Sequence, residues 1–318
     1  MIARGGSGGE VGSEPPVSGG SSGAGVPSGP LSSEDNVPFE LSPLSAGASS
    51  ITSAILEGAA ETAIFETFVV PGYLTPFAEL ALSALEPVHN ARVAHLLSRT
   101  GFPDREIAQR LPGARIHGFD PSPYAVELAT VKAASAFDVV AEYVCSATLP
   151  SPLPEGVFTH ALLLHPLAAT PQRHALYAEV QRLLRPGGQL VFALPVRGSF
   201  IEVFDLMREY GLKYELPAVD AIVARGVEFR PTVETFAVEL EDAGFVDVDV
   251  ELRPTTLSFR SARDFFESPA TRLLVFPALH AKFDAEALEY LKAAIDKYWS
   301  DADFEMSLNI ACATAHKP

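Results

Sequence analysis

The chain has 318 residues, and its 40 Asp and Glu outnumber its 23 Lys and Arg, which gives a formal net charge of −17 at pH 7. An acidic chain without a run of Lys or Arg repels phosphate backbones and anionic headgroups, so we expect neither nucleic acid nor a membrane as a partner. No apolar stretch approaches the ~20 residues that cross a bilayer. Residues 1–10 also lack the apolar segment of a secretory signal.

Cysteine is scarce, because the chain contains only Cys145 and Cys312. Two distant thiols supply neither a disulfide framework nor a zinc cluster. We therefore expect both to be small buried residues of a cytoplasmic protein.

Residues 1–50 differ in composition from the rest of the chain. More than half of them are Gly, Ser or Pro. Such a segment cannot bury enough apolar surface to offset its chain entropy, so we predict a disordered tail at 1–50 and a folded domain at 51–318. A short apolar cluster at 37–41 leaves open a docking peptide within the tail.

From residue 51 onward, helical and strand patterns alternate. Two helices are expected first, over 51–68 and 76–85, within an N-terminal helical region at 51–90, because apolar residues recur there at helical spacing. The next predictions are strands over 92–97, 115–119, 138–144, 157–164 and 189–194, and helices over 104–111, 123–133 and 171–184. This alternation predicts an α/β protein with a doubly wound, mostly parallel sheet.

The second half of the chain is mixed. Helices are predicted over 199–210, 216–224, 232–243, 262–267, 270–279 and 285–298, and strands over 246–252 and 304–315. Two closing strands after a parallel run predict an antiparallel hairpin at one edge of the sheet.

Several strings resemble the class I S-adenosylmethionine-dependent methyltransferases. The string RLLRPGGQL at 182–190 is similar to that family's turn from a helix into its fifth strand, where Pro and paired Gly stop the helix. LEDAGFVDV at 240–248 resembles the turn into the sixth strand. LSFRSARDF at 257–265 and ATAHKP at 313–318 resemble the branch that acts on small molecules and acyl carriers.

The resemblance covers roughly residues 64–318 and is to an architecture, which does not by itself settle function. It implies a Rossmann-like fold with S-adenosyl-L-methionine as the cofactor. It also implies that the helical elements at 199–230 and 261–299 form a lid over the acceptor substrate.

The cofactor loop departs from the family pattern. The family ends its first strand in an acidic residue and a Gly-rich turn, because the turn needs positive φ and the cofactor approaches the backbone. Here His95 stands at the position of the acid, Leu97 and Arg99 at those of the first two glycines, and only Gly101 remains, after Thr100. Side chains at these positions take up space, and Arg99 adds positive charge beside a cationic cofactor. We therefore predict that cofactor binding is impaired or lost.

Other positions of the family's cofactor site are kept in part. Asp120, followed by Pro121, ends the second strand, where the resemblance implies a carboxylate that binds the ribose hydroxyls. Asp in this position is also ordinary turn chemistry before a helix. Ser146, with Ala147, stands where the family has an acid near the adenine amine. Tyr73 lies on a segment that covers the cofactor cleft in relatives, although an aromatic there also suits a core.

His165 falls at the carboxyl end of the fourth strand, where doubly wound sheets keep their ligand sites. It is the candidate general base, with a packing role as the alternative. Histidines elsewhere lack metal-ligand spacing, so we expect no metal. The chain also lacks the Gly-x-Ser-x-Gly elbow of hydrolases and the Gly-x-Gly-x-x-Gly loop of nicotinamide dehydrogenases.

These features leave more than one function open. The preferred hypothesis is a methyltransferase-like protein with an impaired cofactor site, which serves as a non-catalytic binding or regulatory module for a small-molecule ligand or a protein partner. The alternative is an active methyltransferase on a small-molecule or acyl acceptor. A purely structural partner-binding protein, without a pocket, is a third class. The oligomeric state is left open.

Overall fold

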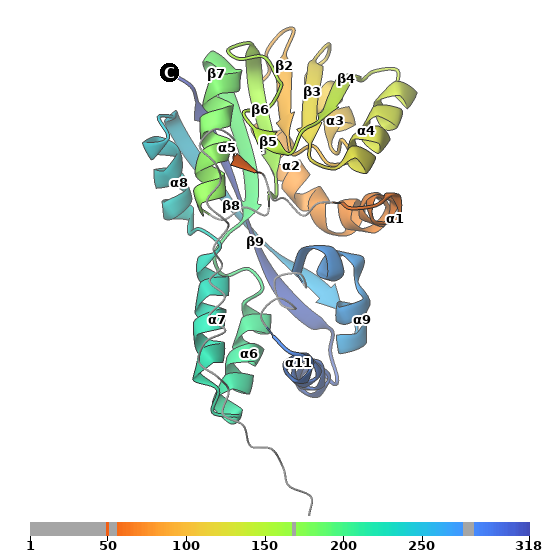
Figure 1. The fold of residues 1–318 in the computed structure, drawn as a ribbon, viewed down its shortest axis with the longest axis vertical. Coiled ribbons are helices and arrows are strands. Elements are labelled where there is room, and N and C mark those ends of the chain that lie inside the picture. The colour runs from red at the N-terminus through yellow and green to blue at the C-terminus, as the bar shows by residue number, and fades with distance from the viewer. Residues whose placement is uncertain (1–48, 51–55, 167–169, 276–282) are drawn as a thin grey trace, which may run out of the picture. The chain divides into compact units, whose positions relative to one another are not determined.

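The computed structural model describes residues 49–50, 56–166, 170–275 and 283–318. Its main sheet has seven strands in the order β4-β3-β2-β6-β7-β9-β8 (Figure 1). These are β2 (Arg92–Leu96), β3 (Arg115–Asp120), β4 (Val140–Cys145), β6 (Phe158–Leu164), β7 (Leu184–Pro195), β8 (Val246–Phe259) and β9 (Phe304–His316). The first five strands in this order, from β4 through β3, β2 and β6 to β7, are parallel. Strand β9 is antiparallel to both of its neighbours. The predicted doubly wound sheet with an antiparallel edge pair is confirmed.

The central strands are buried on both faces because alternate side chains enter two separate apolar clusters. In β6, for example, Leu162 belongs to one cluster and Leu163 to the other. Helices α2 (Thr75–Ala84), α3 (Asp104–Arg110) and α4 (Pro123–Ser135) contribute to the first cluster, and α5 (Thr170–Leu183) and α8 (Val233–Asp242) to the second. This double burial explains the continuous apolar runs of these strands.

The helical segment before β2 differs from the prediction. Helix α1 (Ala59–Ile64) passes directly into the π-helix η1 (Phe65–Leu74), which passes into α2. Pro71 lies inside η1 and has no backbone N–H to donate. The wider π turn accommodates it, and the Thr75 hydroxyl donates to the Val70 carbonyl at 3.0 Å. The loop predicted between residues 68 and 76 is therefore wrong, and Tyr73 lies on a helix.

Strands β8 and β9 are long, and they extend beyond the rest of the sheet toward a group of helices (Figure 1). These helices are α6 (Ile201–Lys213), α7 (Pro217–Glu228), α9 (Ala262–Glu267) and α11 (Ala285–Tyr298), with the short π-helix η2 (Thr271–Val275) after α9. Strand β8 continues past Pro254, well beyond the predicted end at residue 252, because a sheet edge tolerates proline.

Some predictions fall on residues that the structure does not describe. The predicted tail at 1–50 lies outside the described residues except for β1 (Ser49–Ser50), which pairs with β5 (Thr148–Leu149). Residues 51–55 of the first predicted helix also lie outside them, as do residues 276–279 of the helix predicted at 270–279. In the described part of the chain, no helix is long and apolar enough to cross a membrane.

The two cysteines differ in burial. Cys312 is buried in β9, as predicted, whereas Cys145 is exposed, so the prediction of a second buried thiol is wrong. Cys145 ends β4, which has a neighbouring strand on one side only. An edge strand leaves part of its side chains in solvent, and this explains the exposure.

Candidate functional site

The loop after β2 has the backbone of a glycine turn but carries larger side chains. Leu97, Arg99 and Gly101 have φ of +53°, +47° and +72°. Only glycine adopts such values freely, so Leu97 and Arg99 are strained. The Gly101 N–H donates to the Ser98 carbonyl at 2.8 Å, and the Arg99 N–H donates to Oδ2 of Asp120 at 2.9 Å. These bonds hold the turn in place despite the strain.

The Arg99 side chain lies inside this turn and is 5% exposed. Its Nη2 donates to the His165 carbonyl at 2.6 Å, and its Nη1 lies 3.4 Å from the Leu164 carbonyl. The guanidinium also lies 5.4 Å from the centre of the Phe65 ring, on η1. Burial lowers the pKa of Arg99, and the nearby Asp120 opposes that shift. Arg99 thus joins the β2 loop to the end of β6.

Little space remains in the loop. The cavity lined by Phe65, Leu97, Arg99, Thr100 and other residues of the turn has a volume of about 10 Å³. This is about the space that one water needs, whereas small-molecule and cofactor sites usually occupy at least ~300 Å³. Thr100 is completely buried, and its hydroxyl has no hydrogen-bond partner among the described residues. The side chains of the loop therefore fill the position where a glycine turn leaves room.

His95 belongs to a buried hydrogen-bonded group that the sequence analysis did not find. Its Nδ1 lies 2.7 Å from Oδ1 of Asp104, and the Tyr143 hydroxyl donates to Oδ2 of the same carboxylate at 2.5 Å. Asp104 is 2% exposed. The carboxylate of Asp104 thus connects the end of β2, just before the loop, to β4. The three residues lie on different elements, so no local sequence pattern links them.

Asp120 lies at the end of β3, as predicted, and it is 3% exposed. Each carboxylate oxygen has a backbone partner, since Oδ1 accepts from the Ser122 N–H and Oδ2 from the Arg99 N–H, both at 2.9 Å. Burial raises the pKa of Asp120, and the two backbone hydrogen bonds oppose the rise. In this structure the carboxylate therefore connects the β2 loop to the start of α4.

Ser146 and Ala147 were predicted to lie beside the adenine. A backbone hydrogen bond places Ser146 next to Asp120. The Ser146 N–H donates to the Asp120 carbonyl at 3.0 Å, and its hydroxyl donates to the Thr148 carbonyl at 3.2 Å. Ala147 is exposed, whereas Pro121 is buried and its carbonyl lies 3.5 Å from the Cys145 sulfur. The structure thus brings Asp120 and Ser146 together, but the Ser146 hydroxyl bonds to the β5 backbone.

His165 and Tyr73 form a buried pair at the end of β6. The Tyr73 hydroxyl and Nε2 of His165 are hydrogen-bonded at 2.9 Å, and the imidazole also packs edge-on against Phe77. Burial lowers the pKa of His165 well below its ordinary value, and the nearby charges of Arg99 and Arg230 lower it further. The imidazole is thus neutral and enclosed, and its contacts are those of a packing residue.

Arg230 is a further, partly buried cation that the sequence analysis missed. Its guanidinium lies 4.6 Å from the centre of the Phe200 ring, and burial lowers its pKa to about 10. With His165 it lines a second cavity of about 30 Å³. In the part of the chain that the structure describes, no three His, Cys, Asp or Glu residues form a group that could hold a metal.

Comparison with known proteins supports the fold. The family model described as a methyltransferase domain matches residues 97–192. No curated protein matches the chain. The YcgJ protein from Bacillus subtilis is 12% identical, with a TM-score of 0.50 over 76% of this chain and 98% of its own.

A second similar structure contains bound S-adenosyl-L-methionine. The Haemonchus contortus phosphoethanolamine N-methyltransferase 2 in complex with S-adenosyl-L-methionine is 18% identical, with a TM-score of 0.48 over 81% of this chain. The match spans 57% of that enzyme's chain. By its strand order and by the domain at residues 97–192, the chain has the Rossmann-like fold of the class I S-adenosylmethionine-dependent methyltransferases and carries their methyltransferase domain.

Proposed function

We propose that this chain is a methyltransferase-fold protein with an impaired cofactor site, and that it serves as a non-catalytic binding or regulatory module. The observation that carries the proposal is the Arg99 side chain inside the β2 loop, bonded to the carbonyls of Leu164 and His165. A cofactor in this loop has to displace the guanidinium and break those bonds.

Space and charge both support this proposal. The cavity around Arg99, of about 10 Å³, is far too small for a nucleoside. S-adenosylmethionine also carries a positive sulfonium and a positive ammonium, and a buried guanidinium repels them with little screening by water. His95 replaces the usual acid, and its Nδ1 is engaged by Asp104. Asp120, at the end of β3, bonds to the loop, and its two oxygens accept backbone N–H groups.

The alternative is an active methyltransferase that acts on a small-molecule or acyl acceptor. It is supported by Asp120, which keeps its position at the end of β3, and by the match to the methyltransferase domain. In that function, Arg99 has to leave its bonds to the end of β6 before the cofactor binds. The two functions therefore differ in whether the cofactor displaces Arg99.

We extend the proposal to the partner and the compartment. The net charge of −17 favours a small-molecule ligand over nucleic acid or an anionic membrane. Both cysteines are free thiols, and Cys145 is exposed. A free exposed thiol suits the reducing conditions of the cytoplasm.

Titration calorimetry with S-adenosylmethionine and S-adenosylhomocysteine tests the proposal. We expect no binding by the natural protein up to about 1 mM, and a Kd in the range of about 10–100 μM for the double variant Leu97→Gly/Arg99→Gly. The glycines remove the guanidinium and relieve the strained φ. The matched Leu97→Ala/Arg99→Ala variant, which keeps the strain, should bind more weakly.

Micromolar binding by the natural protein would show that the cofactor displaces Arg99, and it would favour the active enzyme. If both double variants fold but neither binds, Leu97 and Arg99 are not the residues that exclude the cofactor.

A further inference from the structure

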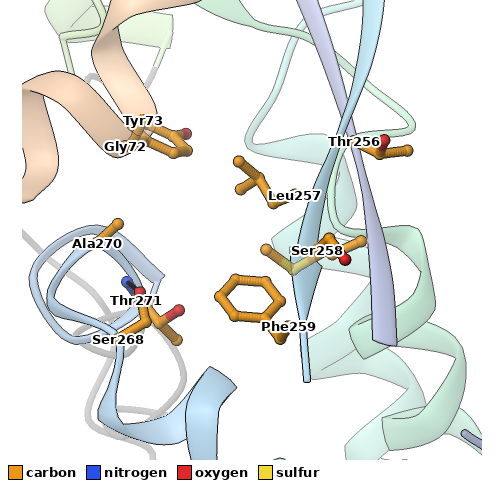
Figure 2. A pocket seen from close by; sticks show the side chains of 10 residues that line it. Gly72, Tyr73, Thr256, Leu257, Ser258, Phe259, Ser268, Ala270 and Thr271 are labelled. Carbon is orange, nitrogen blue, oxygen red and sulfur yellow. Dashed lines mark hydrogen bonds between the residues drawn. The ribbon is translucent and has the colours of Figure 1, made fainter. Parts of the chain in front are cut away.

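A third hollow lies beside η1, apart from the β2 loop and from the cavity beside Arg230. It is bounded by η1, by β8 and β9, and by the segment that runs from α9 into η2 (Figure 2). In Figure 2, Leu257 and Phe259 reach from β8 toward Ala270 and Thr271, and Tyr73 lies above them. The pocket shares no lining residue with the cavity around Arg99.

The pocket has room for a molecule of one or two rings, which is smaller than most small-molecule ligands. Its volume is about 240 Å³, against about 10 Å³ in the β2 loop. A cavity of about 150 Å³ in a protein core holds benzene. Scaled by volume, this pocket accommodates roughly ten non-hydrogen atoms.

The walls of the pocket favour an uncharged ligand. Tyr73, Leu257, Phe259 and Met306 supply apolar surface, and the polar groups that line it include hydroxyls such as those of Ser268 and Thr271. Among the described residues that line the pocket, none is charged. A charged ligand would lose its hydration without a compensating partner, and this loss is costly. Two aromatic side chains also favour a flat ring.

Thr271 supplies the polar contact. Its side chain is 1% exposed and lines the pocket, yet its hydroxyl has no hydrogen-bond partner among the described residues. Buried hydroxyl groups in native proteins are nearly always bonded. A ligand oxygen in the pocket would complete the hydrogen bonding of this group.

The position of Tyr73 is fixed independently of any ligand. Its hydroxyl is bonded to His165 at 2.9 Å, and its ring packs against Phe77 with 5.4 Å between the ring centres. This wall of the pocket is therefore formed in advance, which lowers the ordering cost of binding.

We propose that this pocket binds a neutral, flat molecule of about ten non-hydrogen atoms, with an oxygen hydrogen-bonded to Thr271 and a ring between Tyr73 and Phe259. This inference rests on the proposed function in one respect, because both assign ligand binding to the protein.

Methyl NMR of the full chain, labelled at the methionine methyl groups, tests the proposal. The chain has three methionines, Met1, Met207 and Met306, and of these Met306 lines the pocket. The probe is 2-naphthol, compared with naphthalene, which lacks the oxygen, and with 2-naphthoate, which is charged. We expect a saturable shift of the Met306 signal, with the Met207 signal unchanged.

The three probes should bind in a defined order. We expect 2-naphthol to bind about fivefold more tightly than naphthalene, because one hydrogen bond separates them. We expect 2-naphthoate to bind at least about tenfold more weakly than 2-naphthol. An unmoved Met306 signal with all three probes, or equal binding of naphthol and naphthoate, would overturn the proposal.

Thr271→Val keeps the shape of the side chain and removes its hydroxyl. In this variant 2-naphthol should bind as weakly as naphthalene, whose own affinity should not change. Thr62→Val is the matched control, because Thr62 is a buried threonine outside the pocket whose hydroxyl donates to the Gly58 carbonyl at 2.9 Å. An unchanged naphthol affinity in Thr271→Val would contradict the assigned hydrogen bond.

If Thr271→Val does not fold, the order of the three probes on the natural protein still decides the question. The calorimetric test with S-adenosylmethionine is a separate measurement. Cofactor binding together with a Met306 response would overturn the impaired cofactor site and leave the pocket standing. No cofactor binding, together with an unmoved Met306 signal, would overturn the pocket and leave the impaired cofactor site standing.

Discussion

Helix η1 lines two hollows that differ in almost every property. Phe65 and Leu74 face the cavity of the β2 loop, which a buried guanidinium fills almost completely. Gly72 and Tyr73 face the pocket beside β8, which is larger and is lined by apolar side chains and uncharged hydroxyls. The filled loop has strained backbone at Leu97 and Arg99. Of these two hollows, the one with room for a ligand lies away from the cavity around Arg99.

The largest expected effect on the filled loop comes from a substitution of Asp104. In Asp104→Ala, Nδ1 of His95 and the Tyr143 hydroxyl both lose their buried carboxylate partner. We expect a loss of about 3 kcal/mol in the free energy of unfolding, because a buried imidazole and a partly buried hydroxyl lose their hydrogen-bond partner. Urea denaturation measures the loss.

Glu142→Ala serves as the control, because this carboxylate lies on the same strand as Tyr143 but is 84% exposed. We expect it to change the stability by less than about 0.5 kcal/mol. Equal losses in the two variants would show that the buried group does not support the loop.

His165 bonds to Tyr73, at the wall of the open pocket, and its carbonyl accepts a hydrogen bond from Arg99, in the filled loop. Its pKa is lowered well below the ordinary value, first by burial and then by Arg99 and Arg230, so the folded protein keeps the imidazole neutral. The unfolded chain takes up this proton near pH 6.5. The free energy of unfolding should therefore fall as the pH drops below about 6.5, with His165 contributing up to about 1.4 kcal/mol per pH unit.

His165→Asn should remove this share of the pH dependence, and asparagine also tolerates the φ of +47° at this position. Burial lowers the pKa of His160 and His117 too, so part of the slope should remain. Urea unfolding between about pH 5 and 7 measures the difference in slope. Parallel stability curves for the two proteins would contradict a neutral, buried His165.

The smallest expected effect concerns the rim of the open pocket. Gly72 lies in η1 without a positive φ, and a Cβ there would meet no atom within 4 Å. Gly72→Ala should raise the free energy of unfolding by about 0.5 kcal/mol, because alanine loses less backbone entropy on folding. Gly113 is the matched position, with equal space but a φ of +78°.

Gly113→Ala should lower the stability by about 1 kcal/mol, because alanine is strained at positive φ. Urea denaturation compares the two variants. A loss of stability in both would show that the pocket rim is strained like the β2 loop.

The parts of the fold that follow local rules could be predicted from the sequence. Strands β6 and β7 were predictable because each has an apolar run between turn residues. The π-helix η1 was not, since Pro71 and Gly72 are typical of a turn, and only the packing of η1 against the domain keeps the chain helical there. The cysteine prediction failed at Cys145 for a related reason, because an edge position depends on the order of the strands.

The candidate site divides in the same way. The sequence by itself placed Leu97 and Arg99 in a turn of the glycine-rich type, directly after a strand that contains His95, and placed Asp120 at the end of the next strand. Tertiary structure decided that Arg99 bonds to carbonyls 65 and 66 residues away. It also decided that Thr271 lines a pocket and that its hydroxyl has no partner among the residues the structure describes. Turn and strand patterns depend on neighbouring residues, whereas the direction of a buried side chain depends on atoms that other elements bring to it.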